Sequence, residues 1–285
     1  MKKRLVVYGA SGTAKDVVCS LDADQYEIVG MIDDASAVQG YNEWSGTEVR
    51  PSERLNEWEY DYVIISSPWH YTSMMSHLNA LGVSEEKIVV WKPVNKITCL
   101  DQRVAYLRLC LDQIKEKNVE GACAELGVYK GDFSKHINRY LPDRKLYLFD
   151  TFEGFGEQNV LDIEREKMRK NALNGFQDTT VAEVLEKMDH PDQCIVCKGF
   201  FTQTAENIDE KFALVSLDAD LHETIKSGLE YFYPRLSSGG YLFVHDYGEY
   251  AWPGVKVAVD EYCRQHHIPI FPILDMCLSA VIIKQ

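Results

Sequence analysis

Positive charge is scarce in this sequence. Its 30 lysines and arginines are outnumbered by 44 aspartates and glutamates, which gives a formal net charge of −14 over 285 residues. No basic cluster stands out beyond residues 2–4. Surfaces that bind nucleic acids or acidic membranes need basic patches, so the charge balance argues against both kinds of partner. We predict that the protein binds no nucleic acid.

Long hydrophobic runs and regularly spaced cysteines are also missing. No apolar stretch approaches the roughly 18 residues of a membrane-spanning helix, and the one after Met1 ends at Gly9, too short for an export signal. The eight cysteines are scattered. Cys194 and Cys197 lie three apart in an apparent strand, where they point to opposite faces, and no second pair accompanies them. We therefore predict a cytoplasmic protein without membrane insertion and without a metal or redox role for this pair.

What the chain does contain is two series of alternating strand and helix patterns. Its length favours two domains, which we predict to be residues 1–95 and 96–285. Strands that alternate with helices indicate a parallel sheet with right-handed crossovers, hence an α/β fold in which a small Rossmann-like domain precedes a larger one. The predicted strands are 4–8, 27–32, 61–65 and 87–91, then 121–126, 145–149, 193–197, 212–217 and 241–244.

Two further patterns complete the predicted organisation. Residues 100–117 carry apolar side chains at helical spacing, which predicts a connecting helix that packs on the second domain. The apolar runs 268–274 and 278–283 have no helix between them, which predicts an antiparallel edge of the second sheet. The highly charged stretch 157–174 is either a flap over the site or a solvated surface helix.

Ionisable residues follow two of the predicted strands at the point where each strand ends. Asp218 and Asp220 follow the strand 212–217, and His245 and Asp246 follow the strand 241–244. Parallel sheets bind ligands at the carboxyl ends of their strands. These four residues are therefore candidates for an oxygen-rich site that holds a cation, supplies a general base, or does both. The alternative is that the acids cap helices or lie in solvated turns.

A glycine-containing turn and an acid suggest a nucleoside pocket in the same domain. Glu125, Gly127 and Gly131 join the first strand of the domain to a helix predicted to begin near residue 132. Asp150 ends the next strand, where an acid suits a ribose diol, and Thr151 beside it is a further candidate for cofactor binding. The spacing differs from the dinucleotide fingerprint. S-adenosylmethionine fits better than NAD, because the pocket continues into acids that suit a cationic ligand and a polar acceptor.

Residues 119–267 resemble the metal-dependent sugar O-methyltransferases typified by macrocin O-methyltransferase. The matching segments are 124–131, 149–155, 176–180, 198–202, 217–221, 233–240 and 245–247. The resemblance implies a class I methyltransferase fold, S-adenosylmethionine as donor, and a magnesium ion that grips two adjacent sugar hydroxyls. It implies the following roles: Glu125, Gly127 and Gly131 border the donor, Asp150 holds its ribose, Asp218 and Asp246 bind metal, and Asp220 is the general base.

One position departs from the family pattern. The family usually has two aspartates before a tyrosine, whereas this chain has His245 and Asp246. An imidazole ligand removes a negative charge and prefers manganese, zinc or iron to magnesium. The identity of the metal therefore stays open, with Mg²⁺ or Mn²⁺ as the candidate cofactor. Alternatively, His245 acts as a base with no metal bound. His222, beside Asp220, is a weaker candidate, because we expect it to be exposed on a helix, where a histidine usually has no role.

The first domain carries a second candidate ligand site. Gly9, Ser11 and Gly12 form a turn after the first strand, and Asp33 follows the next strand. These residues resemble the N-terminal domain of bacterial sugar-nucleotide acetyltransferases, which implies binding of a nucleotide or nucleotide-sugar. The hexapeptide repeats of those enzymes are absent, so acetyl transfer is unsupported. A structural or dimerisation role, or NAD binding with Asp33 on a ribose, remains open.

Together these patterns predict a methyltransferase that acts on a sugar hydroxyl, with a sugar or nucleotide-sugar as the small-molecule acceptor. The pathway is expected to be polysaccharide or glycosylated natural-product biosynthesis, and a homo-oligomer is possible. Two alternatives stay open. One is a nicotinamide-dependent sugar-nucleotide oxidoreductase that uses the first domain. The other is a non-catalytic nucleotide-sugar-binding protein with a degenerate methyltransferase domain.

Overall fold

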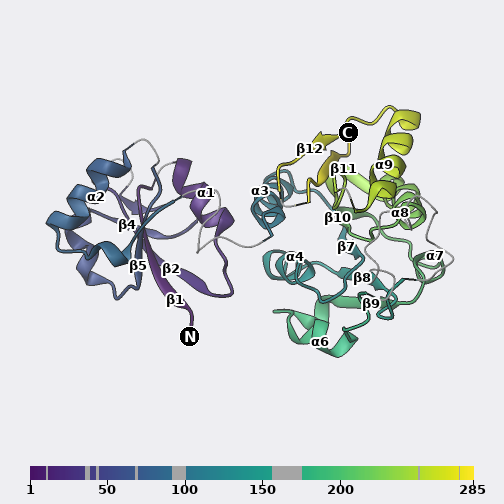
Figure 1. Ribbon diagram of the computed structural model, residues 1–285, viewed down its shortest axis with the longest axis horizontal. Helices are drawn as coiled ribbons and strands as arrows, with labels where there is room; N and C mark the ends of the chain where they lie inside the picture. Colours follow the sequence, from purple (N-terminus) through teal and green to yellow (C-terminus); the bar gives the residue numbers. More distant parts are fainter. Residues whose placement is uncertain are drawn as a thin grey trace. The chain divides into compact units, whose positions relative to one another are not determined.

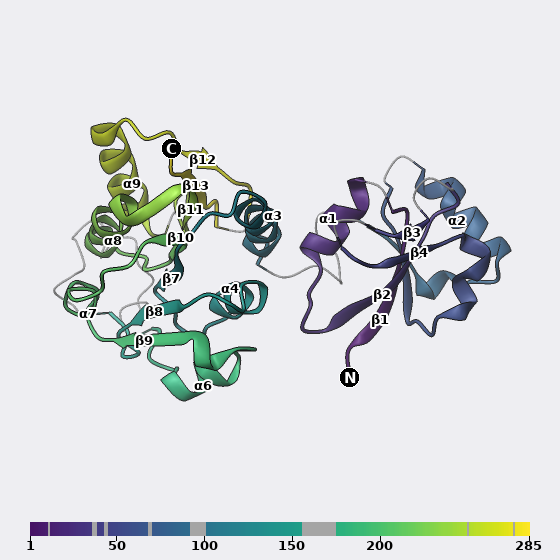
Figure 2. The same cartoon turned by 180° about the vertical axis from the view of Figure 1, so that it is seen from behind.

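The computed structural model describes residues 1–10, 12–35, 39–42, 45–67, 70–91, 101–155, 175–249, 251–275 and 277–285. The chain divides into two compact units, Met1–Tyr106 and Leu107–Gln285, and each unit has its own sheet (Figures 1 and 2). The predicted boundary at residue 95 falls among residues outside the described ranges. It therefore stays a prediction.

The N-terminal unit has a sheet of order β3-β4-β2-β1-β5-β6. All neighbouring strands are parallel except β3 and β4. The strands are β1 (Lys3–Tyr8), β2 (Tyr26–Ile32), β3 (Gly40–Tyr41), β4 (Glu48–Arg50), β5 (Tyr62–Ile65) and β6 (Ile88–Val90). The helical segments are α1 (Gly12–Ser20), η2 (Ser52–Glu57), α2 (Tyr71–Ala80) and η3 (Glu85–Lys87).

Alternation along β1 places this sheet between two apolar layers. Leu5 and Val7 pack in one cluster with Val17 of α1, whereas Val6 and Tyr8 pack in another with Leu78 of α2. Because successive side chains of a strand point to opposite faces, the two helices cover opposite faces of the sheet. This is the doubly wound arrangement that the alternation of strands and helices predicts.

The C-terminal unit has a sheet of order β12-β13-β11-β10-β7-β8-β9. Its strands are β7 (Ala122–Leu126), β8 (Leu146–Asp150), β9 (Cys194–Lys198), β10 (Phe212–Leu217), β11 (Leu236–Val244), β12 (Phe271–Pro272) and β13 (Ala280–Ile283). The helical segments are α3 (Arg103–Glu116), whose first four residues precede the unit boundary, α4 (Ser134–Tyr140), α6 (Val181–Glu186), η5 (Pro191–Gln193), α7 (Phe201–Thr204), α8 (His222–Arg235) and α9 (Pro253–His266). β13 is antiparallel to both β11 and β12, which confirms the predicted antiparallel edge.

Helices cover both faces of this second sheet. Residues of α7, α8 and α9, including Phe201, Phe232 and Val259, pack in one cluster with alternate residues of the central strands. On the other face lie α3 and α4 (Figure 1), where the Tyr241 hydroxyl donates to Gln113 Oε1 at 2.9 Å. The apolar stripe predicted for the connecting helix is buried at Val104, Leu107, Leu111 and Ile114. Burial of each such side chain contributes about 1.5–3 kcal/mol, so the stripe serves packing.

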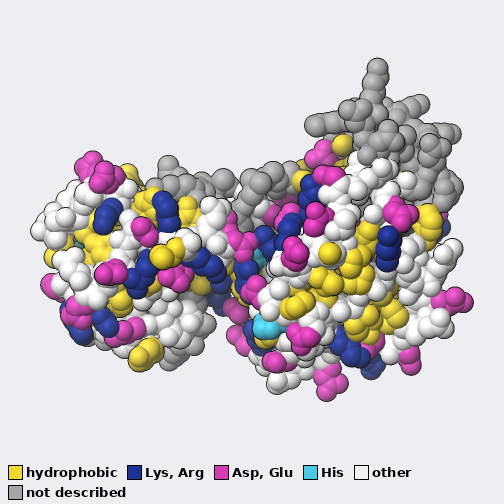
Figure 3. Space-filling model, turned by 90° about the horizontal axis from the view of Figure 1, so that it is seen from below, with side chains coloured by type: hydrophobic (Ala, Val, Ile, Leu, Met, Phe, Trp, Pro, Cys, Tyr) yellow, Lys and Arg dark blue, Asp and Glu magenta, His cyan; other side chains and the backbone are white. Residues whose placement is uncertain are grey.

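The strand order defines where a ligand would bind. From β7 the chain continues to β8 and β9 on one side of the sheet and returns through β10 and β11 on the other. In open α/β sheets, ligands bind beyond the carboxyl ends of the strands at such a switch point. Figure 3 shows acidic, basic and hydrophobic side chains on the visible face. The strand order thus places the candidate site at the ends of β7, β8, β10 and β11.

Candidate functional site

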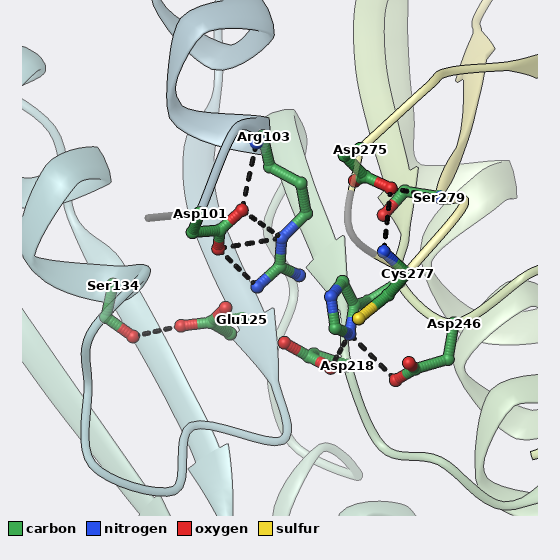
Figure 4. A network of polar contacts seen from close by, with 10 residues as sticks. Asp101, Arg103, Glu125, Ser134, Asp218, Asp246, Asp275, Cys277 and Ser279 are labelled. Carbon is green, nitrogen blue, oxygen red and sulfur yellow. Dashed lines mark hydrogen bonds and ion pairs between the residues drawn. The ribbon is translucent and has the colours of Figure 1, made fainter. Parts of the chain in front are cut away.

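The ends of β10 and β11 bring three carboxylates together. The two strands are parallel neighbours in which Leu217 pairs with Val244, so the residues after each strand emerge side by side. Carboxylate oxygens of Asp218, Asp220 and Asp246 all lie within 4.8 Å of one another. Figure 4 shows Asp218 and Asp246 pointing toward the same place. The arrangement gathers the predicted catalytic and metal-binding acids into one cluster.

The backbone of this cluster is held in an unusual conformation. Asp220 has φ 61° and Asp246 has φ 56°, which is the left-handed region that non-glycine residues seldom occupy. Each such residue costs on the order of 1 kcal/mol or more and persists where surrounding structure fixes it. Here the Asp218 N–H donates to the Leu126 carbonyl at 2.8 Å, and the His245 N–H donates to the Leu217 carbonyl at 2.9 Å. Sheet-type hydrogen bonds therefore fix the chain up to the first residue of each turn.

His245 lies between two of the acids. Its Nδ1 is 2.8 Å from Asp218 Oδ1 and 2.7 Å from Asp246 Oδ2. Burial alone would lower the pKa of His245, but the two carboxylates outweigh that effect and raise the pKa well above its ordinary value. The pKa of Asp220 is also raised, first by burial and then by the negative charges of Asp246 and Asp218.

Cys277 also reaches this cluster, although no spacing in the sequence pointed to it. Its Sγ and ligand atoms of His245 and Asp246 lie within 4.8 Å of one another. Cys277 belongs to the turn between β12 and β13, where Asp275 Oδ1 accepts the N–H groups of Cys277 at 3.2 Å and Ser279 at 2.9 Å (Figure 4). Only the pairing of β13 with β11 brings this turn beside the acids. That pairing connects residues far apart in the sequence.

The predicted donor-binding glycines allow close packing of the chain against itself. Gly127 has φ +88°, and a Cβ there would collide with the backbone carbonyl of Asp218. Gly131 has φ +72°, and a Cβ there would lie 2.9 Å from Val184 Cγ1 of α6. Both positions require glycine for conformation and for space. The first of them joins the turn after β7 directly to the acid cluster.

Asp150 and Thr151 shape the loops at the ends of β7 and β8. Asp150 Oδ2 accepts the N–H groups of Val128 at 2.7 Å and Tyr129 at 2.8 Å, while its Oδ1 accepts the Phe152 N–H at 2.7 Å. The Thr151 hydroxyl donates to the Gly154 carbonyl at 2.8 Å. The carboxylate of Asp150 therefore orders the glycine turn, whatever else it binds.

Two other predicted residues lie deeper than expected. Glu125 is 1% exposed within β7 and accepts a hydrogen bond from the Ser134 hydroxyl of α4. His222 was expected to be exposed, and this is wrong. It is 9% exposed at the start of α8, with Nδ1 2.9 Å from Glu223 Oε1. The reason is that only four residues separate α8 from the end of β10, and α8 packs against that strand.

Aromatic side chains from several loops meet at the same end of the sheet. The ring of Phe176 lies 4.9 Å from that of Tyr129 and 5.1 Å from that of Phe155, both centroid to centroid. Phe155 in turn lies 5.8 Å from Trp252, which immediately precedes α9. These contacts form a group of packed rings at the carboxyl ends of the strands. The stretch 157–174, predicted as a flap or a surface helix, lies outside the described residues.

The candidate site of the N-terminal unit is also built around a tight turn. Gly9 has φ +98°, and a Cβ there would lie 2.5 Å from Ser66 Oγ. Asp33 Oδ2 accepts the Ala10 N–H at 2.9 Å, so its carboxylate ties this turn to the end of β2. Gly12 begins α1, and residue 11 lies outside the described ranges. Nucleotide binding by Gly9, Ser11, Gly12 and Asp33 stays a prediction.

Comparison with known proteins gives the family. The model of the macrocin O-methyltransferase (TylF) family matches residues 74–284. The chain belongs to this family. A second model, described as C2185-like, N-terminal, matches residues 1–89. That description does not test the resemblance of the N-terminal unit to sugar-nucleotide acetyltransferases, which remains a prediction.

Individual relatives match 59–64% of the chain. Demethyldecarbamoylnovobiocin O-methyltransferase of Streptomyces niveus is 29% identical over 182 residues, which is 60% of this chain and 69% of that protein. A tetracenomycin 4′-O-methyltransferase of Streptomyces olivaceus is 29% identical over 179 residues, 59% of this chain and 67% of that protein. The solved O-methyltransferase NovP is 26% identical with a TM-score of 0.56, covering 64% of this chain and 79% of its own.

Membership in the family settles the class of fold and of activity. The predicted class I methyltransferase fold is confirmed, and calicheamicin methyltransferase CalS11 shares it at a TM-score of 0.53 and 21% identity, covering 76% of this chain and 86% of its own. The protein is an enzyme that carries out O-methylation. The oxidoreductase and the non-catalytic alternatives therefore lose their support. Within the described residues, no helix is long and apolar enough to cross a membrane.

Proposed function

We propose that this enzyme transfers the methyl group of S-adenosylmethionine to a hydroxyl group of a sugar or nucleotide-sugar. Membership in a methyltransferase family supports the donor. Two relatives support the acceptor class, because the S. olivaceus enzyme is named for 4′-O-methylation of a rhamnosyl tetracenomycin and a Micromonospora griseorubida relative for 3″-O-methylation of mycinamicin III. The observation that carries the proposal is the convergence of Asp218, Asp220 and Asp246 beside the Gly127 turn.

The reaction needs alignment and the removal of one proton. The acceptor O–H bond breaks, the new O–CH₃ bond forms, and the C–S bond of the sulfonium breaks with its electron pair returning to sulfur. In-line geometry is the main contribution of a binding site to such a displacement. Asp220 is the proposed base that takes the hydroxyl proton. Asp220 can take this proton only in its ionised form, which burial and the neighbouring acids disfavour and which a cation held by Asp218 and Asp246 would favour. A positioned base typically contributes roughly 10²–10⁴ in rate.

A divalent cation fits the same cluster by the chemistry of its donors. Asp218 and Asp246 would hold the cation, and His245 would be a further ligand. Mg²⁺ and Mn²⁺ are the proposed ions. When bound, the cation would lower the pKa of the acceptor hydroxyl. The chain itself would keep the acids converged through the sheet-type hydrogen bonds at the ends of β10 and β11.

The donor site is proposed at the adjacent ends of β7 and β8. Gly127 and Gly131 bound the turn, Glu125 lies beneath it, and Asp150 and Thr151 fix the neighbouring loop. We propose that Asp150 also accepts a ribose hydroxyl, because its Oδ1 takes a single N–H among the described residues. The ordered turn and the acid would then act together on the nucleoside.

The N-terminal unit is proposed to bind a nucleotide or nucleotide-sugar at the turn that contains Gly9 and Gly12. The support is the position of this turn at the carboxyl end of β1 and the tie from Asp33 to Ala10. Titration of the full-length protein with nucleotides tests this proposal. Binding that Asp33→Ala weakens is expected, and no heat with any nucleotide would remove the idea.

The decisive test of the proposed reaction is a screen with methyl-labelled donor. Purified protein is incubated with free sugars, nucleotide-sugars and glycosides, with and without Mg²⁺ or Mn²⁺, and products are separated by mass. Label in an acid-stable methyl ether of one acceptor class is the expected result. Label only on nitrogen or carbon, or tight donor binding without transfer to any sugar, would contradict the proposal.

A further inference from the structure

Two overlapping sets of candidate metal ligands share Asp246. One set consists only of carboxylates, from Asp218, Asp220 and Asp246. The other consists of one imidazole, one carboxylate and one thiol, from His245, Asp246 and Cys277. Carboxylate oxygens suit Mg²⁺, whereas imidazole and thiolate together select zinc-like transition metals. The chain therefore contains ligands of two different chemical preferences at one place.

We propose that Cys277 and His245 make this a site for a thiophilic transition metal such as Zn²⁺ or Co²⁺, with Asp246 as the shared carboxylate. The inference rests on the proposed function in placing the cation beside the acceptor, and it replaces Mg²⁺ or Mn²⁺ there by an ion that prefers sulfur and nitrogen ligands. Thiolate and neutral imidazole are the ligating forms, so the metal replaces their protons, which go to solvent. Four-coordination leaves one position open, as in catalytic zinc sites with three protein ligands.

Hydrogen bonds to Asp275 and from Gly248 hold the turn that carries Cys277 beside the site. Asp275, itself 9% exposed, accepts the N–H groups of Cys277 and Ser279. The Gly248 N–H, two residues after Asp246, donates to the Leu278 carbonyl at 2.9 Å. A Cβ at Gly248 would lie 2.6 Å from Leu278 Cβ, so the two segments are in close contact. Cys277 is thus presented to the cluster by a backbone tied to the end of β11.

His245 is already directed at the shared ligand. Its Nδ1 is 2.7 Å from Asp246 Oδ2, the separation of a hydrogen bond. A metal bound by both groups would require these atoms to part by only about 0.5 Å or slightly more, because ligand atoms about 2.0–2.1 Å from zinc in tetrahedral geometry lie further apart than that. The three ligands come from two segments, the end of β11 and the β12–β13 turn. Their convergence depends on the fold.

Cobalt provides a readout independent of catalysis. The full-length protein is titrated with Co²⁺ and followed for thiolate-to-cobalt charge transfer in the near ultraviolet, and Zn²⁺ and Mg²⁺ affinities are measured by competition. We expect the band in the wild type, its loss in Cys277→Ser, and Zn²⁺ binding about 10- to 100-fold weaker in that variant. Cys197→Ser is the matched control, because Cys197 lies on β9 at the opposite edge of the sheet, and it should retain the band.

A second variant protects the test against a folding defect in the first. His245→Asp makes the set carboxylate-rich and should shift the preference from Zn²⁺ toward Mg²⁺. A band that persists in Cys277→Ser, or wild-type binding of Mg²⁺ at least as tight as that of Zn²⁺, would overturn the inference. Failure of the proposed function is distinguishable. Sugar methylation supported by Mg²⁺ without the cobalt band defeats only the metal assignment, and a cobalt band without methylation of any sugar defeats only the function.

Discussion

The sharpest prediction concerns the carboxylate that orders the donor turn. Asp150 accepts three backbone N–H groups, from Val128, Tyr129 and Phe152, at 2.7–2.8 Å. In Asp150→Asn the negative charge is lost and one oxygen becomes an NH₂ group, which cannot accept. At least one charge-assisted hydrogen bond disappears. A hydrogen bond to a charged group contributes about 1.5–3 kcal/mol.

This loss converts directly into an expected change in affinity. If donor binding must reorder the turn in the variant, the free energy of the lost hydrogen bond is subtracted from the free energy of binding. A loss of about 1.4 kcal/mol raises the dissociation constant tenfold. We therefore expect S-adenosylhomocysteine to bind roughly 10- to 150-fold more weakly to Asp150→Asn than to the wild type. Isothermal titration calorimetry measures the change. Asp192→Asn, which removes the same charge from an exposed residue of η5, should bind as the wild type does.

The ribose contact can be separated from the ordering of the turn. An analogue of S-adenosylhomocysteine that lacks one ribose hydroxyl is titrated into both proteins. If Asp150 binds that hydroxyl, the variant should lose less affinity on its removal than the wild type does. Equal affinity of the wild type and Asp150→Asn for S-adenosylhomocysteine would refute the reasoning about both roles.

Two further predictions concern stability. Gly127→Ala should destabilise the C-terminal unit by about 2–4 kcal/mol in chemical denaturation, because φ +88° strains alanine and its Cβ would meet the Asp218 carbonyl. Gly239→Ala is the control: its φ is +80°, but a Cβ there would meet only Val119 Cγ2, at 3.2 Å, so its loss of stability should be clearly smaller. Equal losses of stability in the two variants would contradict the packing argument. Burial alone would raise the pKa of Asp34, but hydrogen bonds from Ser52 and Tyr8 lower it, so its stabilisation is present above its unfolded pKa and is lost as pH falls through the lower folded value. The Asp34 side chain is 45% exposed, so solvent screening reduces this contribution. Asp34→Asn should therefore cost less than about 1 kcal/mol at neutral pH and begin to converge with the wild type below roughly pH 4, and a difference that persists unchanged in acid would contradict this assignment.

Much of the fold follows from local patterns in the sequence. Buried parallel strands are continuous apolar runs, and each such run became a strand close to its predicted position, including β7, β8 and β10. The two-residue strand β3 and the three-residue strand β4 were missed, because so short a pairing leaves no periodic pattern. β11 begins at Leu236 rather than at residue 241, because Gly239 and Gly240 interrupt the apolar run without ending the strand.

The candidate site was only partly visible in the sequence. Asp218 and Asp246 could be paired because each ends an apolar run, and adjacent strand ends meet. The position of Cys277 depends on the antiparallel return of β13 beside β11, a contact between distant segments that spacing does not encode. The part that Asp150 plays in ordering the glycine turn was also hidden, since a strand-terminal acid looks the same whether it faces a ligand or backbone N–H groups.

The central claim is that the carboxylates after β10 and β11 provide the base for O-methyl transfer. The most direct measurement compares wild type and Asp220→Asn for methyl transfer to the acceptor found in the screen and for calorimetric binding of S-adenosylhomocysteine. We predict a rate lower by roughly 10²–10⁴ with unchanged affinity for S-adenosylhomocysteine. An Asp220→Asn enzyme that methylates its acceptor at the wild-type rate would contradict the account.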